Sequence, residues 1–233
     1  MDAIQQLELL AEKLGELRDA VVVVGGCAPA LILDIGTAPD LRITDDVDIL
    51  IHTPSYRGYI DFIDKLKAQG FVEREGDPIG RCASGELVVD VVPTEADVLG
   101  FTNRWYTQAF GKAVRKKLPS GKSIKTVTSV YFVATNLEAF KQRGRNDFMT
   151  SVDFEDIITV LMEHRTFEQE LKEADLEVQK YISAQFKEIV SNQDYPHVLS
   201  AHVRGDEASQ AFVPMLRELI ERIASREFYV DRL

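Results

Sequence analysis

The sequence predicts an α/β fold of the α+β kind, in which a small mixed-sheet domain (residues 1–128) is followed by an all-helical domain (residues 129–233). In the first half, β-branched apolar runs alternate with amphipathic segments, whereas from Ser129 onward only helical periodicity remains. The chain has 233 residues, of which 45% are hydrophobic and 28% are charged. That is enough apolar material to bury a core without disulfide or metal support.

The first elements are a helix, a buried strand and a short helix. Apolar residues recur every three or four positions over residues 3–18, which indicates an amphipathic helix. The run Ala20–Val24 is continuous and rich in β-branched residues, as in a strand buried on both faces, and it ends at Gly25 and Gly26. A helix over residues 27–35 follows, with a proline in its first turn, where the missing N–H costs little.

The remaining elements of the first half are strands and one longer helix. Residues 47–51 form a strand that follows a polar approach. Ser55 is expected to cap a helix that runs to about residue 69 and stops at Gly70. Further strands are expected over residues 71–75, 79–83 and 86–92.

The second half is expected to contain helices over residues 130–143, 151–164, 167–191 and 207–223. No apolar run approaches the ~20 residues that cross a bilayer, and the first residues lack a basic leader and an apolar signal core. We therefore expect a cytoplasmic protein with no membrane partner. Cys27 and Cys82 are expected to be buried thiols in a reducing compartment.

Charge is distributed unevenly along the chain. The formal net charge is −11, yet residues 101–150 carry ten basic and two acidic residues. An acidic chain with one basic island argues against a general nucleic-acid coat and permits one local site for phosphates. A solvated basic face is the alternative interpretation. The island is centred on Arg115–Lys117, with Lys112, Lys122 and Lys125 nearby.

Three carboxylates stand on or beside predicted strands. Asp46 and Asp48 are two residues apart and point to the same face, because strand side chains alternate. Asp90 lies inside an apolar run, where a carboxylate is costly unless a partner compensates it. If the two strands are neighbours, the three carboxylates converge, and magnesium suits such an oxygen-ligand site beside phosphates. The alternatives are an acidic loop at the head of a strand, and an Asp90 that is paired with a base.

A glycine pair, Gly25 and Gly26, separates the first strand from the next helix. Glycine allows a ligand to approach the backbone closely, and a helix N-terminus presents N–H groups and a favourable dipole. These features favour a phosphate site, although a glycine pair by itself is more often a simple turn. The order of strand, glycine pair, helix and then Asp-x-Asp on the next strand is much more specific.

The stretch VVVVGGCAPALILDIGTAPDLRITDDVDILI resembles the signature of the DNA polymerase β-type nucleotidyltransferase superfamily. Its fuller form, with Gly25, Gly26, Arg42, Thr44, Asp46 and Asp48, is similar to the minimal bacterial branch that includes AbiE-type toxins. A second stretch, FVATNLEAFKQRGRNDFMTSVDFEDIITVL, resembles the helical motif of that branch, with Asn136 where the motif usually has lysine. The resemblance covers roughly residues 20–165.

The resemblance implies roles for these residues. Asp46, Asp48 and Asp90 would be catalytic and would bind Mg²⁺, and Asp90 would help to deprotonate an attacking hydroxyl. Nucleotide binding would involve Gly25, Gly26, Arg42, Thr44, Lys141, Arg143 and Asp153, with Lys141 or Arg143 substituting for the missing lysine. Asp153 has an alternative role at a helix N-terminus, where acidic residues are favoured.

The function that follows is magnesium-dependent transfer of a nucleoside monophosphate (NMP) from a nucleoside triphosphate (NTP) to a hydroxyl. The resemblance favours tRNA as the acceptor, with the protein acting as a toxin that is paired with an antitoxin. A small hydroxylated acceptor, as in aminoglycoside nucleotidyltransferases, is one alternative. The other is a nucleotide-binding or partner-binding module of the same fold that has lost the chemistry, for which Asn136 is the motivating observation.

Overall fold

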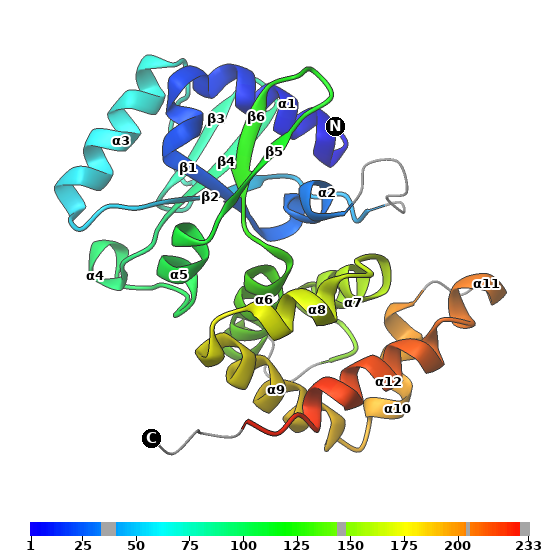
Figure 1. The fold of residues 1–233 in the computed structure, drawn as a ribbon. Coiled ribbons are helices and arrows are strands. Elements are labelled where there is room, and N and C mark those ends of the chain that lie inside the picture. Colours follow the sequence, from blue (N-terminus) through cyan, green and yellow to red (C-terminus); the bar gives the residue numbers. More distant parts are fainter. Residues whose placement is uncertain (34–40, 144–147, 204–205, 229–233) are drawn as a thin grey trace. The chain divides into compact units, whose positions relative to one another are not determined.

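The computed structural model describes residues 1–33, 41–143, 148–203 and 206–228 (Figure 1). The chain divides into two units, Met1–Thr135 and Asn136–Leu233, so the division falls inside helix α6 (Ser129–Arg143). The sequence predicts it just before that helix. The beginning of α6 belongs to the first unit because it packs there: the ring of Tyr131 lies 6.3 Å from that of Trp105, and Asn103 donates a 2.7 Å hydrogen bond to the Thr135 carbonyl.

One mixed six-stranded sheet forms the centre of the first unit, in the order β3-β4-β2-β1-β6-β5. The strand β2 pairs antiparallel with β1 and parallel with β4, which confirms the predicted mixed sheet. The strands are β1 (Val21–Val24), β2 (Val47–Ile51), β3 (Arg81–Ser84), β4 (Leu87–Pro93), β5 (Val114–Lys117) and β6 (Ser123–Thr126).

The centre of this sheet follows directly from the β-branched runs. All four valines of β1 are buried, as expected for a central strand covered on both faces. In β4, buried and half-buried residues alternate, so Leu87, Val89 and Val91 face the core and Asp90 points to the other face.

The helices of the first unit are short apart from α1 (Ala3–Leu14) and α3 (Tyr56–Ala68), which lie along the sheet in Figure 1. Asp2 and Gln5 form a capping box at the start of α1, and Ser55 caps α3 as predicted. The others are the 3₁₀ segments η1 (Gly15–Ala20) and η2 (Gly25–Cys27), and the helices α2 (Pro29–Ile32), α4 (Ala96–Leu99) and α5 (Tyr106–Gly111).

The first unit differs from the sequence prediction in several details. The helix expected over residues 3–18 ends at Leu14, where the 3₁₀ segment η1 begins. The hairpin of β5 and β6 is not predicted, because its edge strand is made of exposed, mostly charged residues that carry no apolar alternation. Residues 71–75 are not a strand, since Val72 makes only an isolated bridge to Ala83. The helix expected over residues 27–35 is the short α2, and residues 34 and 35 lie outside the described part of the chain.

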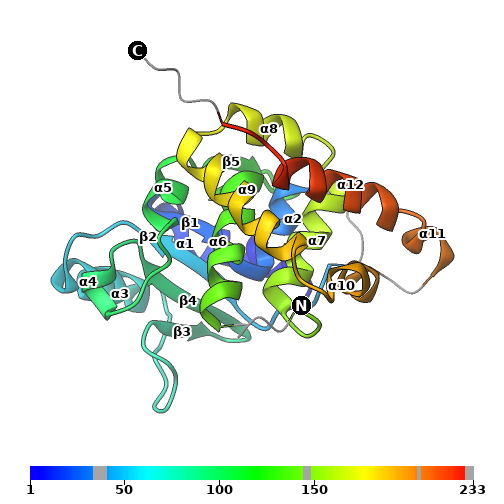
Figure 2. The same ribbon diagram turned by 90° about the horizontal axis from the view of Figure 1, so that it is seen from below.

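The second unit is helical, as the sequence predicts. Its helix α12 (Val213–Ala224) packs against α9 (Leu176–Val190), as Figures 1 and 2 show. Besides the later part of α6, the other helices are α7 (Val152–Glu163), α8 (Phe167–Glu173), α10 (Tyr195–His202) and α11 (Glu207–Gln210). None of the helices in the described residues combines the length and hydropathy that a bilayer crossing requires.

The helix expected over residues 167–191 is divided in two. Ala174 adopts an extended conformation between α8 and α9. The side chain of Gln179 then donates hydrogen bonds to the carbonyls of Lys172 (3.2 Å) and Ala174 (2.6 Å), which satisfies carbonyls at the end of α8. The apolar period continues across this break, so the pattern alone could not reveal it.

Both cysteines lie in the core of the first unit, which predicts slow thiol chemistry. Cys27 and Cys82 are fully buried, and burial raises the pKa of the Cys82 thiol to about 11. Below that pH the thiol is neutral, and only the thiolate is nucleophilic. We expect native protein at pH 8 to react negligibly with a disulfide reagent. In protein unfolded with guanidinium, we expect two thiols per chain to react with the reagent. A rapid phase of one thiol in native protein would contradict this burial.

Candidate active site

A row of charged side chains crosses three adjacent strands of the sheet. Asp48 on β2 is directly beside Asp90 on β4, and Asp90 is directly opposite Arg81 on β3. Residues paired in this way point to the same face, on strands ~4.8 Å apart. Asp46, two residues before Asp48, projects to that face as well. The sheet therefore brings the three predicted carboxylates together.

Arg81 links two of these carboxylates. Its Nε and Nη2 donate hydrogen bonds of 2.8 and 2.7 Å to the two oxygens of Asp90, and Nη2 also donates one of 2.5 Å to Asp46 Oδ2. The three side chains are each between 25% and 29% exposed, so water screens this cluster only in part. The hydrogen bond with Asp90, together with the charges of Asp90 and Asp46, raises the pKa of Arg81 against the opposing effect of desolvation.

The sequence prediction misses Arg81, although a signal for it exists. In the hairpin of β3 and β4, Ser84 pairs with Leu87 across the turn at Gly85 and Glu86. Three residues farther from the turn on each strand, the same register pairs Arg81 with Asp90. A hairpin assignment for residues 79–92 would thus have identified the base that compensates Asp90.

Gly25 lies against the side chain of Asp48. Val24 pairs with Asp48 across β1 and β2, and Gly25 follows with a φ of +62°. A Cβ atom at Gly25 would stand 2.1 Å from Asp48 Oδ2, so no other residue fits without moving that carboxylate. A Cβ at Gly26 would stand 2.9 Å from Arg42 Nη2 and 3.3 Å from Thr44 Oγ1.

The glycine pair thus gathers Arg42, Thr44 and Asp48 around one stretch of backbone, which agrees with the order of residues in the sequence motif. One part of the sequence interpretation needs correction. The following helix α2 is only four residues long, so its dipole contributes little to a phosphate site. Any phosphate binding by Gly25 and Gly26 depends instead on the close approach that glycine permits.

The loop before β2 is fixed from the first helix. Gln6 on α1 is buried and donates a 2.6 Å hydrogen bond to the Thr44 carbonyl. Thr44 Oγ1 in turn donates to the Asp46 carbonyl at 3.2 Å and lies 3.3 Å from Asp46 Oδ1. Gln6 is a positioning residue that the sequence prediction misses, because one glutamine on a helix carries no distinctive pattern.

The donor chemistry of Asp46 and Asp48 fits a hard divalent cation, since both are carboxylates that lie on the same side, one just before β2 and one within it. Asp90 differs, because Arg81 donates to both of its oxygens. Within the described residues, no group of three or more His, Cys, Asp and Glu side chains is arranged to hold a metal ion. The pairing of Asp90 with a base matches the alternative interpretation of that residue, and its role as a metal ligand stays a prediction.

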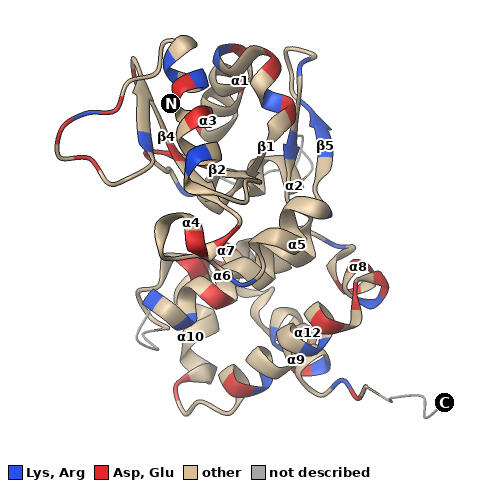
Figure 3. Cartoon of the chain, turned by 90° about the vertical axis from the view of Figure 1, so that its left-hand side faces the viewer, with Lys and Arg blue, Asp and Glu red and all other residues tan. Residues whose placement is uncertain are grey.

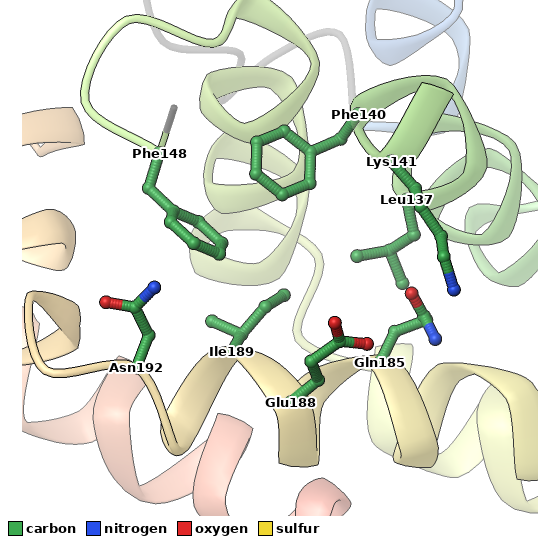
Figure 4. Close-up of a pocket in the computed structure, with 8 residues that line it drawn as sticks. All are labelled: Leu137, Phe140, Lys141, Phe148, Gln185, Glu188, Ile189 and Asn192. Atoms are coloured by element: carbon green, nitrogen blue, oxygen red, sulfur yellow. The ribbon is translucent and has the colours of Figure 1, made fainter. Parts of the chain in front are cut away.

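The other predicted nucleotide-binding residues belong to the second unit. Arg143 Nη2 donates a 2.7 Å hydrogen bond to Asp153 Oδ1, and Asp153 is buried near the start of α7. Lys141 lines a cavity of about 70 Å³ with Phe140 and Phe148, and Figure 4 shows its side chain extending toward α9. Asn136 is buried in α6. A part for Lys141, Arg143 and Asp153 in nucleotide binding stays a prediction.

Most of the basic island lies in the hairpin of β5 and β6, and Figure 3 shows cations along β5. Several of them contact acidic residues of α1 and η1. Arg115 forms a 2.8 Å ion pair with Asp19, and Lys122 forms one of 3.4 Å with Glu12. These contacts indicate that part of the island fastens the hairpin to the N-terminal segment.

Comparison with protein-family models and with curated proteins finds no match for this chain. Among solved structures, ANT(2″)-Ia in complex with adenylyl-2″-tobramycin is similar with a TM-score of 0.44 and 13% sequence identity, over 72% of this chain and 94% of that one. A protein from H. pylori that is assigned as a nucleotidyltransferase gives a TM-score of 0.44 and 12% identity, over 97% of this chain and 98% of that one.

Proposed function

We propose that this protein is a magnesium-dependent nucleotidyltransferase that moves an NMP from an NTP to a hydroxyl acceptor. The observation that carries the proposal is the register that sets Asp48 beside Asp90, together with Gly25 packed against Asp48. Carboxylates on one face of a sheet beside a half-buried glycine turn provide ligands for a hard cation and close access for phosphates. The sequence motif, which includes Gly25 and Asp48, supports the same chemistry.

Each part of the site has a role in this proposal. Asp46 and Asp48 would hold Mg²⁺, which when bound neutralises triphosphate charge and lowers the pKa of the attacking hydroxyl. Asp90 would orient that hydroxyl and accept its proton. Gly25 and Gly26 would admit the phosphates to the backbone, and catalysis would come mostly from positioning and charge stabilisation.

The acceptor that we propose is tRNA, with the protein acting as a growth-inhibiting toxin that an antitoxin controls. The support is the resemblance of the two sequence motifs. The β5–β6 hairpin adds one exposed cation, because Lys117 is exposed and forms no ion pair within the described residues. A small hydroxylated acceptor is the alternative, because the net charge of −11 disfavours a large RNA footprint.

The experiment is transfer of label from each of the four α-labelled NTPs, with Mg²⁺, to total tRNA or to a pool of small hydroxylated compounds. The control is the double variant Asp46→Asn/Asp48→Asn. Label that enters an acceptor only with the wild-type chain supports the transferase and identifies both base and acceptor class. Transfer to tRNA should weaken steeply as salt rises, because contacts with RNA phosphates release counterions.

The second candidate is a nucleotide-binding module without transfer activity. Two observations favour it: Asn136 replaces the usual lysine of the motif, and Arg81 engages both oxygens of Asp90. Such a module would bind NTP with Mg²⁺ and release no pyrophosphate. Equilibrium NTP binding, measured beside pyrophosphate release, separates the two candidates.

A further inference from the structure

We propose that Arg81 takes the place of one divalent cation, so that the site holds a single cation at Asp46 and Asp48. The guanidinium bridges Asp46 and Asp90, and this bridge makes Arg81 a positioning residue that acts through Asp90. The catalytic meaning of this assignment rests on the proposed function. The number of cations bound is a property of the chain itself and can be measured without nucleotide.

The first argument is geometric. In two-metal sites that transfer phosphoryl groups, the cations stand ~3.5–4 Å apart, so carboxylates between them are shared. Here a single nitrogen, Arg81 Nη2, contacts Asp46 Oδ2 at 2.5 Å and Asp90 Oδ2 at 2.7 Å. A magnesium ion that bridged the two residues through these oxygens would need them at ~2.1 Å, whereas Asp46 Oδ1 accepts no hydrogen bond from Arg81. The guanidinium and a cation that bridges the two Oδ2 atoms therefore exclude each other.

The second argument is that Arg81 is firmly placed. Its Nε holds the other oxygen of Asp90 at 2.8 Å, so the contact is bidentate and fixes the guanidinium plane. The preceding Gly80 has a φ of +90°, and a Cβ there would stand 2.7 Å from the Val91 carbonyl oxygen. The Val91 N–H donates a 2.9 Å hydrogen bond to the Gly80 carbonyl, which holds the start of β3 against β4.

The third argument is charge. Asp46, Asp48 and Asp90 carry a formal charge of −3, which Arg81 reduces to −2, and Arg42 beside Gly26 reduces it further, so less metal charge is needed to neutralise the site. An arginine keeps its charge at every working pH, because its pKa exceeds ~12. A second cation would leave a net positive site before any nucleotide arrives. With Arg81 in place, the chain itself supplies the positive charge that a second cation would otherwise bring. That charge lies at Asp90, the carboxylate that is proposed to accept the proton.

The test counts Mn²⁺ bound per chain, without nucleotide, by titration followed by electron paramagnetic resonance. We expect one bound Mn²⁺ in the wild type and two in Arg81→Gln, because that change removes the charge and releases Asp90. Arg81→Lys keeps a cation beside the carboxylates and should still bind one. A merely structural role for Arg81 would leave the count unchanged.

Three results would overturn the assignment: two Mn²⁺ in the wild type, none in the wild type, or equal counts in the wild type and Arg81→Gln. Thermal melting with and without Mn²⁺ is the second measurement, and added Mn²⁺ should raise the Tm of Arg81→Gln more than that of the wild type. An equal rise in Tm would also contradict the proposal. If the counts are as expected but no NMP is transferred, the proposed function fails while the assignment of Arg81 stands.

Discussion

Replacing Asp48 with asparagine is expected to abolish NMP transfer while leaving the fold intact. The side chain keeps its size, but the site loses one of the two carboxylates that would hold the cation. Stabilisation by a bound metal is worth several kcal/mol, and each 1.4 kcal/mol is a factor of ten, so the loss should be on the order of 10³-fold. The measurement is the rate of label transfer from an α-labelled NTP at saturating Mg²⁺.

The matched control for this variant is Asp45→Asn, the same chemical change at an exposed residue three positions earlier in the chain. It should retain wild-type transfer. The Tm of Asp48→Asn should stay close to that of the wild type, because asparagine keeps the size of the side chain beside Asp90 and Gly25. A large fall in Tm would mean that Asp48 supports the fold rather than the chemistry.

Replacing Gly25 with alanine is expected to destabilise the protein and to abolish transfer together. Alanine in the left-handed region costs about 1–2 kcal/mol, and here its Cβ would also overlap Asp48 Oδ2 at 2.1 Å. The carboxylate must therefore move. Urea unfolding measures the loss of stability, and label transfer measures the loss of function.

Gly85→Ala is the matched control for Gly25→Ala. Gly85 has a φ of +66°, close to the +62° of Gly25, but a Cβ there would meet nothing within 4 Å. Gly85→Ala should lose only the free energy of unfolding that alanine costs in the left-handed region, and it should transfer NMP at the wild-type rate. The difference between the two variants isolates the displacement of Asp48. Equal stability and equal transfer in the two variants would contradict the close packing of Gly25 against that carboxylate.

Much of the first unit could be predicted because β1, β2 and β4, at the centre of its sheet, are mostly apolar runs. The apolar, β-branched residues of β1 and β2 favour strands over helices. Strand alternation then places Asp46 and Asp48 on one face. The convergence with Asp90 needed one further condition, that β2 and β4 are neighbours, and the parallel pairing of these strands satisfies it.

The features that the sequence could not supply are long-range or depend on polar contacts. The role of Arg81 comes from hairpin register, and that of Gln6 from one hydrogen bond to a loop 38 residues away. The strand β5 was not predicted because edge strands are often charged, which hides the alternation. The break before α9 depends on the capping of carbonyls by Gln179, which leaves the apolar period intact.

The measurement that tests the transferase most directly compares the same NTP labelled at the α-phosphate and at the γ-phosphate. The proposed function predicts that the α label enters the acceptor and that the γ label leaves as pyrophosphate. Both changes should be lost in Asp46→Asn/Asp48→Asn. Transfer of the γ label to the acceptor, or Mg²⁺-dependent NTP binding with neither label transferred, would contradict a nucleotidyltransferase.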